Sequence, residues 1–137
     1  MAQGEPVFRK IDCHMLRATD LDAAVAFYGQ ALGHQLVWRT EEAVAFRLPE
    51  SDAELVVHRH LGPETDLLVR DADAAFRTLI NAGAEPMNAP FDIPIGRCAV
   101  VKDPFGNRLT VLDQSKGQFV TDETGVVIGV TGNRDPT

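Results

Sequence analysis

The sequence contains only two cysteines, Cys13 and Cys98, and they form neither a C-x-x-C pair nor a disulfide framework. We therefore expect two free thiols in a reducing compartment. No apolar run approaches the ~20 residues that a membrane-spanning helix needs. The first ten residues also lack the apolar segment of a secretory signal. These absences predict a soluble, cytoplasmic protein that does not bind a membrane.

Basic residues are scarce as well. Thirteen Lys and Arg stand against twenty Asp and Glu, which gives a formal net charge of −7. A chain this acidic, with no basic stripe, repels phosphate backbones, so nucleic acid is not an expected partner. With 137 residues, of which 45% are hydrophobic, the chain is long enough to bury a core of its own.

An internal repeat indicates how the chain is organised. The segment LRATDLDAAV (residues 16–25) is matched by LLVRDADAAF (residues 67–76), 51 residues later. In both segments an apolar strand pattern runs into D-x-D-A-A and then into a helix pattern. Asp20 and Asp71 stand where an N-cap carboxylate accepts hydrogen bonds from backbone N–H groups. The self-similarity predicts two copies of one supersecondary unit.

Each helix pattern has one apolar face and ends at a glycine. Gly33 and Gly83 occupy the position of a left-handed helix terminator. We therefore predict two regular amphipathic helices of about three turns each. The apolar residues that recur at helical spacing are Leu21, Ala24, Val25, Tyr28 and Leu32 in the first helix, and Ala72, Ala75, Phe76, Leu79 and Ile80 in the second.

Strand patterns surround both helices, so the predicted order is β-α-β-β-β twice, an α+β fold. The first module comprises residues 1–61 and the second comprises residues 62–116. The Pro-rich residues 88–96 are predicted to be a loop, and DPFG at 103–106 a turn. The predicted strands are 10–18, 34–39, 43–48 and 53–59 in the first module, and 65–69, 84–87, 97–102 and 107–113 in the second.

Residues 117–137 form a third segment. Its QFVTDETGVVIGV stretch predicts a hairpin that turns at DETG. Such a hairpin would either pair with a sheet edge or cover the mouth of a pocket. The last residues, from 131, are predicted to be disordered.

Two motifs resemble the vicinal-oxygen-chelate superfamily. CHMLRATDLDAAVAFYGQALG (residues 13–33) resembles its opening module, and KDPFGNRLTVLD (residues 102–113) resembles its closing motif. The superfamily includes glyoxalase I, extradiol dioxygenases, methylmalonyl-CoA epimerase and fosfomycin and bleomycin resistance proteins. The resemblance implies two sequential βαβββ modules that form a cup-shaped mixed sheet and, by analogy, a homodimer. It is a weak guide to the reaction, because this scaffold hosts many chemistries.

In the enzymes of this superfamily, each module supplies two inward positions that bind a divalent metal, usually through His, Glu or Gln. The resemblance places these positions at Cys13, Glu54, Glu64 and Thr110. Two carboxylates, a thiol and a hydroxyl are an unusual ligand set for a catalytic divalent metal ion. We therefore expect neither a metal nor another cofactor. A bulge in the first strand would bring in His14 instead of Cys13; without it, His14 faces the helix as a core histidine.

Glu54 and His58 are the candidate catalytic residues. Burial would make Glu54 a general base, whereas an ion pair within the cup is the simpler interpretation. His58 shares its face and would hydrogen-bond a ligand or act as an acid or base. The two lie four residues apart on one strand, about 13 Å, too far to chelate one ion. The candidate ligand-binding residues are Cys13, Met15, Arg17, Trp38, Glu64 and Thr110.

Several of these residues have two interpretations. Arg17 lies where glyoxalase I carries an anion-binding arginine, and it would either clamp an anionic ligand or pair with Glu54 or Glu64. Glu64 itself is either a site carboxylate or a solvated turn residue. Cys13 is expected to be a small buried thiol rather than a nucleophile. Among the aromatic residues, Trp38, Phe46 and Phe91 would either line the pocket or pack in the core.

Three classes of function are compatible with the sequence. The first is a metal-independent protein that binds a small organic molecule in the cup, and we favour it. The second is a glyoxalase-like lyase or isomerase, either metal-dependent or using Glu54 or His58 in acid–base catalysis. The third is a structural or regulatory domain with a filled cup.

Overall fold

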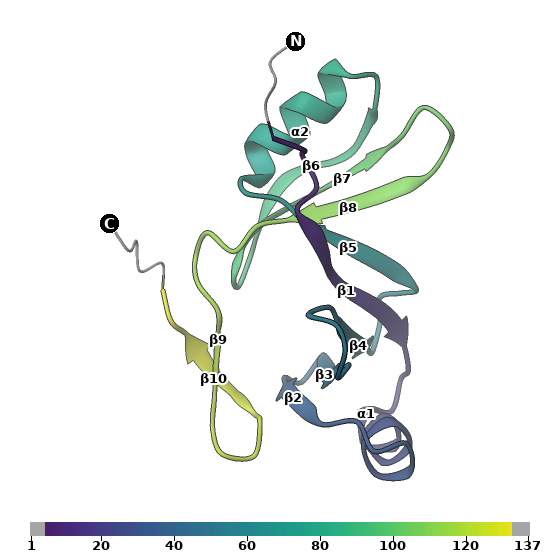
Figure 1. The fold of residues 1–137 in the computed structure, drawn as a ribbon, viewed down its shortest axis with the longest axis vertical. Helices are drawn as coiled ribbons and strands as arrows, with labels where there is room; N and C mark the ends of the chain where they lie inside the picture. The colour runs from purple at the N-terminus through teal and green to yellow at the C-terminus, as the bar shows by residue number, and fades with distance from the viewer. Residues whose placement is uncertain (1–4, 133–137) are drawn as a thin grey trace. The chain divides into compact units, whose positions relative to one another are not determined.

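The computed structural model describes residues 5–132 of the chain. These residues form two compact units, whose elements Figure 1 labels. The first-module unit consists of residues 12–65 and 119–131. The second-module unit consists of residues 5–11, 66–118 and 132. Residues 5–11 therefore pack with the second module, and residues 119–131 pack with the first module.

The first-module unit is built on the four strands β1 to β4, in the order β2-β3-β4-β1. β2 pairs with β3 and β3 with β4 in antiparallel fashion, whereas β1 and β4 are parallel. A parallel pair needs a long crossover, and the helical segment supplies its first part. The elements are β1 (Lys10–Arg17), α1 (Leu21–Ala24), the π-helix η1 (Val25–Ala31), β2 (Leu36–Arg39), β3 (Ala43–Arg47) and β4 (Glu54–His58).

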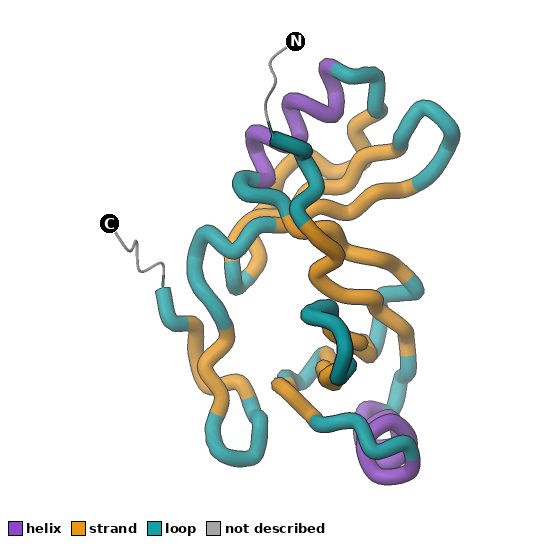
Figure 2. Tube along the Cα trace, viewed as in Figure 1, coloured by secondary structure: helices purple, strands orange, loops and turns teal. Residues whose placement is uncertain are grey.

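The second module repeats this arrangement with β5 to β8, in the order β5-β8-β7-β6. β5 and β8 are parallel, and the other pairs are antiparallel. The elements are β5 (Glu64–Leu68), α2 (Ala72–Asn81), β6 (Glu85–Ile93), β7 (Gly96–Lys102) and β8 (Arg108–Leu112). Figure 2 shows the alternation of helix and strand in both modules. The predicted α+β fold with two sequential βαβββ modules is confirmed.

The two helix starts follow the sequence prediction. Asp20 and Asp71 have extended backbones, and their carboxylates accept hydrogen bonds from the backbone N–H groups of Ala23 and Ala74, both at 3.0 Å. An N-cap of this kind stabilises a helix by about 1 kcal/mol. Each cap depends only on residues three positions apart, which is why sequence inspection finds it.

The first helix departs from the prediction. After Ala24 it continues as the π-helix η1, in which the N–H of Leu32 bonds to the carbonyl oxygen of Phe27, five residues earlier. This wider turn changes the angle between successive side chains, so positions chosen at α-helical spacing do not stay on one face. Leu32, predicted on the buried face, is 53% exposed. α2 is a regular helix and buries Ala72 and Ala75 as predicted.

The sheet of the first-module unit is buried on both faces. On the face that α1 and η1 cover, Val44, Phe46 and Val57 pack with Leu21 and Ala24 of the helix. Phe46 is therefore a packing residue. The opposite face, which we call the inner face, carries a second cluster whose members are Cys13, Met15, Ala43, Ala45 and Val56, with Val37 and Trp38 against it.

In the second-module unit, the core lies between α2 and the strands, where Ala72 and Ala75 meet Ala99 and Val111. Asp113 fixes the start of α2, because its Oδ2 accepts a hydrogen bond from the Ala72 N–H at 2.8 Å. The same carboxylate accepts hydrogen bonds from the backbone of Arg97 and from Ser115. The fold thus uses a buried carboxylate, 2% exposed, to join α2 to β7.

The Pro-rich segment is a strand rather than the predicted loop. β6 runs from Glu85 to Ile93 along β7, with register shifts after Pro86 and after Asn88. β6 lies at the end of its strand order, where proline is tolerated because one side needs no hydrogen-bond donor. Phe91 pairs with Cys98 in this ladder and is 38% exposed, while Cys98 is a buried free thiol.

The segment after β8 forms the predicted hairpin, β9 (Phe119–Thr121) and β10 (Val127–Val130). Asp122 closes its DETG turn by accepting hydrogen bonds from Thr124 and Val126. The N–H of Arg39 bonds to the carbonyl oxygen of Gly125 at 2.8 Å, so the hairpin pairs with the edge strand β2. The predicted disordered tail lies almost entirely outside the described residues. Within residues 5–132, no helix is long and apolar enough to cross a bilayer.

Candidate functional site

The inner face of the first-module unit gathers most of the predicted site residues. β1 and β4 are parallel neighbours, and their register sets Cys13 beside Glu54, Met15 beside Val56 and Arg17 beside His58. Because side chains alternate along a strand, these residues share one face. Cys13 and Met15 are buried, Glu54 and His58 are half-buried, and Arg17 is exposed.

Glu54 is held by the only tryptophan of the chain. The indole Nε1–H of Trp38, on β2, donates a hydrogen bond to Oε1 of Glu54 at 3.0 Å. Because the indole N–H can only donate, the contact fixes which way this oxygen faces. The ring of Phe119 packs against Trp38, with ring centroids 4.8 Å apart. The hairpin, the indole and the carboxylate therefore form one chain of contacts.

His58 has a structural partner that the sequence did not reveal. Its Nδ1 accepts hydrogen bonds from the backbone N–H groups of His60 and Leu61, both at 3.0 Å. An accepting Nδ1 carries no proton, so the imidazole proton of the neutral ring is on Nε2. Burial lowers the pKa of His58, and the nearby His60 lowers it further, against the opposing carboxylates of Glu42 and Glu64. His58 is therefore neutral at pH 7 and offers Nε2–H as a donor.

The other two predicted positions differ in their surroundings. Glu64 opens β5, is half-buried and lies close enough to His58 to act on its pKa. Thr110 lies on β8 in the second-module unit, 5% exposed and in register with Asp66 on β5. Asp66, also 5% exposed, is a buried carboxylate that the sequence reasoning missed. Period-two alternation from Glu64 would have placed it on the same strand face.

His14 and His60 lie away from the inner face. The ladder between β1 and β4 is continuous, so Cys13 and not His14 stands beside Glu54, and the alternative with a bulged strand is wrong. His14 was also expected in the core, but it is exposed, and its Nδ1 lies 2.9 Å from Oγ1 of Thr65. His60 is exposed and contacts the Glu42 carboxylate at 3.2 Å.

The residues at the four positions that the superfamily resemblance implies do not fit a divalent metal. One oxygen of Glu54 accepts the Trp38 N–H, Cys13 is packed among apolar side chains, and the fourth position is a threonine. In the part of the chain that the structure describes, no three His, Cys, Asp or Glu side chains are grouped closely enough to hold an ion.

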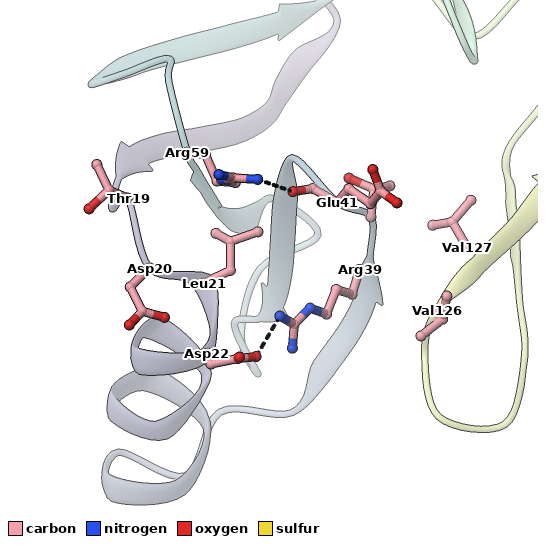
Figure 3. Close-up of a pocket in the computed structure, with 10 residues that line it drawn as sticks. Thr19, Asp20, Leu21, Asp22, Arg39, Glu41, Arg59, Val126 and Val127 are labelled. Atoms are coloured by element: carbon pink, nitrogen blue, oxygen red, sulfur yellow. Dashed lines mark hydrogen bonds and ion pairs between the residues drawn. The ribbon is translucent and has the colours of Figure 1, made fainter.

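A separate pocket of about 670 Å³ opens on the other side of the same sheet. Figure 3 shows the side chain of Arg39 turned toward Asp22 and that of Arg59 turned toward Glu41, with Val126 and Val127 of the hairpin beyond Glu41. Its lining comes from four separate segments, residues 19–22, 39–41, 59 and 126–127. No local sequence pattern joins these segments, so sequence reasoning could not find this pocket.

A search of protein-family models matches residues 13–112 to the glyoxalase-like domain. No curated protein matches the chain. Among solved structures, methylmalonyl-CoA epimerase from Mycobacterium tuberculosis is similar, with a TM-score of 0.64 and 19% identity over 82% of this chain and 92% of that one. Homoprotocatechuate 2,3-dioxygenase from Brevibacterium fuscum has a TM-score of 0.57 and 23% identity, over 80% of this chain and 37% of that one.

A third similar structure is described as an NAD-dependent benzaldehyde dehydrogenase from Legionella pneumophila. It has a TM-score of 0.61 and 16% identity, over 74% of this chain and 97% of that one. These three names describe unrelated reactions, and all three identities are low. The similarities therefore establish the fold, and they leave the chemistry to the residues of the site.

Proposed function

Since the chain belongs to the glyoxalase-like domain family, we propose that it binds a small organic molecule on the inner face of the first module. The observation that carries this proposal is the hydrogen bond from Trp38 to Glu54 within an apolar surface. Small-molecule sites are mostly apolar, with a few placed polar groups that orient the ligand. Cys13, Met15 and Val56 supply the apolar surface, and Glu54 supplies the polar group.

The chemistry of this face suggests the class of ligand. A carboxylate accepts hydrogen bonds, so the ligand presents a hydroxyl or an amine to Glu54. Its remaining surface is apolar and packs on Met15 and Val56. Arg17 at the exposed end of β1 would pair with an anionic group, if the ligand has one. The proposed binding needs no metal, because the donor set does not fit one.

The test uses Trp38 as a reporter, since its fluorescence arises from the only indole of the chain. A library of small phenols, hydroxy acids and amines is screened by fluorescence quenching. Hits are then titrated against Glu54→Gln, Glu54→Ala and the exposed control Glu50→Gln. We expect both Glu54 variants to weaken binding about tenfold, as loss of a charged hydrogen-bond acceptor does. Unchanged affinity in both would refute the assignment of Glu54.

Metal content is tested separately. The purified protein is analysed for Ni, Zn, Mn and Fe, before and after incubation with each ion. We expect no stoichiometric metal and no difference between the wild type and Glu54→Ala. A stoichiometric ion that is lost in Glu54→Ala would contradict the metal-free proposal.

A second candidate function is acid–base isomerisation, and the fixed orientation of the Glu54 carboxylate favours it. A positioned carboxylate can remove a proton from a carbon next to a carbonyl group. Exchange of that proton in D2O, followed by NMR on each hit, separates the two functions. An isomerase exchanges the proton in the wild type and not in Glu54→Gln, whereas a binding protein leaves it in place in both.

A further inference from the structure

The loop between β4 and β5, residues 59–63, is held by the last side chain of β4. Nδ1 of His58 accepts hydrogen bonds from the backbone N–H groups of His60 and Leu61, both at 3.0 Å. An imidazole nitrogen can accept only while it carries no proton. The conformation of this loop therefore depends on the protonation state of one ring.

The same loop fits closely against β1. Gly62 has a φ of +117°, and a Cβ atom there would lie 3.1 Å from the carbonyl carbon of Leu16 and 3.2 Å from the carbonyl oxygen of Met15. Glycine suits both the left-handed backbone and the close approach. Met15 and Arg17 face the proposed ligand site from this part of β1. The loop thus rests on the backbone that presents two inner-face residues.

The charged and titratable groups that face His58 come from several elements. Arg17 stands beside it on β1, Glu42 directly precedes β3, Glu64 opens β5, and His60 lies in the loop. Burial lowers the pKa of His58, the Glu42 carboxylate raises it, His60 lowers it and Glu64 raises it, with a lowered pKa as the result. The closed loop therefore disfavours the charged ring.

We propose that His58 is a proton-dependent latch for the loop between the two modules. While Nδ1 is unprotonated, residues 60–62 are closed on β1. A proton from water that binds Nδ1 turns the acceptor into a donor, so both amides lose their partner and the loop opens. Opening exposes the charged ring to water, which is why proton uptake and opening occur together. The latch responds to pH whether or not a ligand is bound.

The other contacts of the loop do not replace these two hydrogen bonds. Nε2 of His60 lies 3.2 Å from Oε1 of Glu42, and this contact becomes an ion pair when His60 is protonated. The two side chains are 66% and 54% exposed, so water screens the pair and it contributes little. Leu61 is 50% exposed, so opening the loop removes little apolar surface from burial.

The experiment is an NMR titration of the 15N-labelled full-length protein between pH 8 and pH 4. The ring nitrogens of His58 report protonation, and the heteronuclear NOE of the His60 and Leu61 amides reports loop motion. We expect the ring to titrate below its usual value of about 6.5, from the Nε2–H tautomer, with both amides following the same midpoint. One hydrogen bond shifts an opening equilibrium about fivefold, so loss of both should raise the open population about twenty-five-fold.

Two substitutions of His58 separate the acceptor from the titration. His58→Asn keeps an acceptor oxygen that does not titrate, so the loop should stay closed throughout the range. His58→Ala removes the acceptor, so the loop should be open at every pH.

Three further variants test the midpoint. Glu42→Gln removes a carboxylate that raises the pKa of His58, so the midpoint should fall, whereas His60→Gln removes a group that lowers it, so the midpoint should rise. His34→Asn is the control, because Nδ1 of His34 contacts the carbonyl oxygen of Arg47 instead, and it should leave the midpoint unchanged.

Three outcomes would overturn the proposal. The ring of His58 could titrate while both amides keep their NOE, the loop could remain closed in His58→Ala, or the midpoint could be the same in Glu42→Gln and His60→Gln. Each of these results concerns the loop alone. Ligand binding at Glu54 is decided by its own titrations, so the proposed function would stand.

Discussion

Replacing Phe119 with alanine should release the hairpin from the inner-face site. The hairpin is held to the sheet by the ring contact between Phe119 and Trp38 and by the hydrogen bond from Arg39 to Gly125. An aromatic pair contributes about 0.5–1.5 kcal/mol beyond its buried area, and half-burial of a Phe side chain contributes about 1 kcal/mol more. Loss of the half-buried ring should therefore cost about 2 kcal/mol of docking free energy, about thirtyfold in the population of the undocked hairpin.

The fluorescence of Trp38 reports this change directly. In Phe119→Ala we expect a red-shifted emission, stronger quenching by acrylamide and faster hydrogen exchange at the Arg39 amide. Global stability should change less, because the hairpin contributes no side chain to the helix-side core. Val120→Ala, at the next and exposed position of β9, serves as the control. Emission, quenching and exchange identical to those of the wild type would refute the view that Phe119 holds the hairpin in place.

Two further changes test the framework of each unit. Asp113→Ala leaves the backbone N–H groups of Ala72 and Arg97 without an acceptor. Each unsatisfied N–H group costs about 1–3 kcal/mol, so the free energy of unfolding in a urea titration should fall by about 3 kcal/mol. A loss below 1 kcal/mol would contradict the role of this carboxylate. His58 has a lowered pKa in the folded state, so the unfolded chain binds its proton more tightly. The stability that this histidine contributes is complete above its unfolded pKa of about 6.5 and is lost as the pH falls through the lower folded pKa. The fall should be smaller in His58→Asn and unchanged in Arg77→Gln, an exposed position of α2, measured by urea unfolding between pH 5 and pH 8, and equal slopes in all three proteins would rule out His58 as the cause.

The parts of the fold that were predictable from sequence depend on residues close together in the chain. The caps of Asp20 and Asp71 span three positions, and the turn at Asp122 spans four. Such contacts leave a local signature of residue type and spacing. The π-helix and the long β6 were missed because they depend on what packs against them. Proline normally argues against a strand, and only the edge position of β6 makes it acceptable.

The candidate site was predictable in outline and not in detail. The superfamily resemblance placed Cys13 and Glu54 at inward positions, and the structure sets the two side by side on one face. The partner of Glu54 is Trp38, sixteen residues away on a strand that is not its neighbour in the sheet. The turn contacts of His58 were also missed, although the histidine lies only two and three residues from its donors. A histidine at the end of a strand that accepts hydrogen bonds from the next backbone N–H groups has no clear sequence pattern.

The sequence by itself determined the two-module fold, because the repeat, the helix caps and the turns are local and appear twice. Only the tertiary structure decided that Cys13 rather than His14 stands beside Glu54. It also decided that Trp38 donates to that carboxylate. The pairing of the hairpin with β2, and the place of Val126 and Val127 in the lining of a pocket, were likewise decided by the tertiary structure. The physical reason is register. A shift of one residue moves every side chain of a strand to the other face, and the register of strands distant in sequence is fixed by packing across the whole unit.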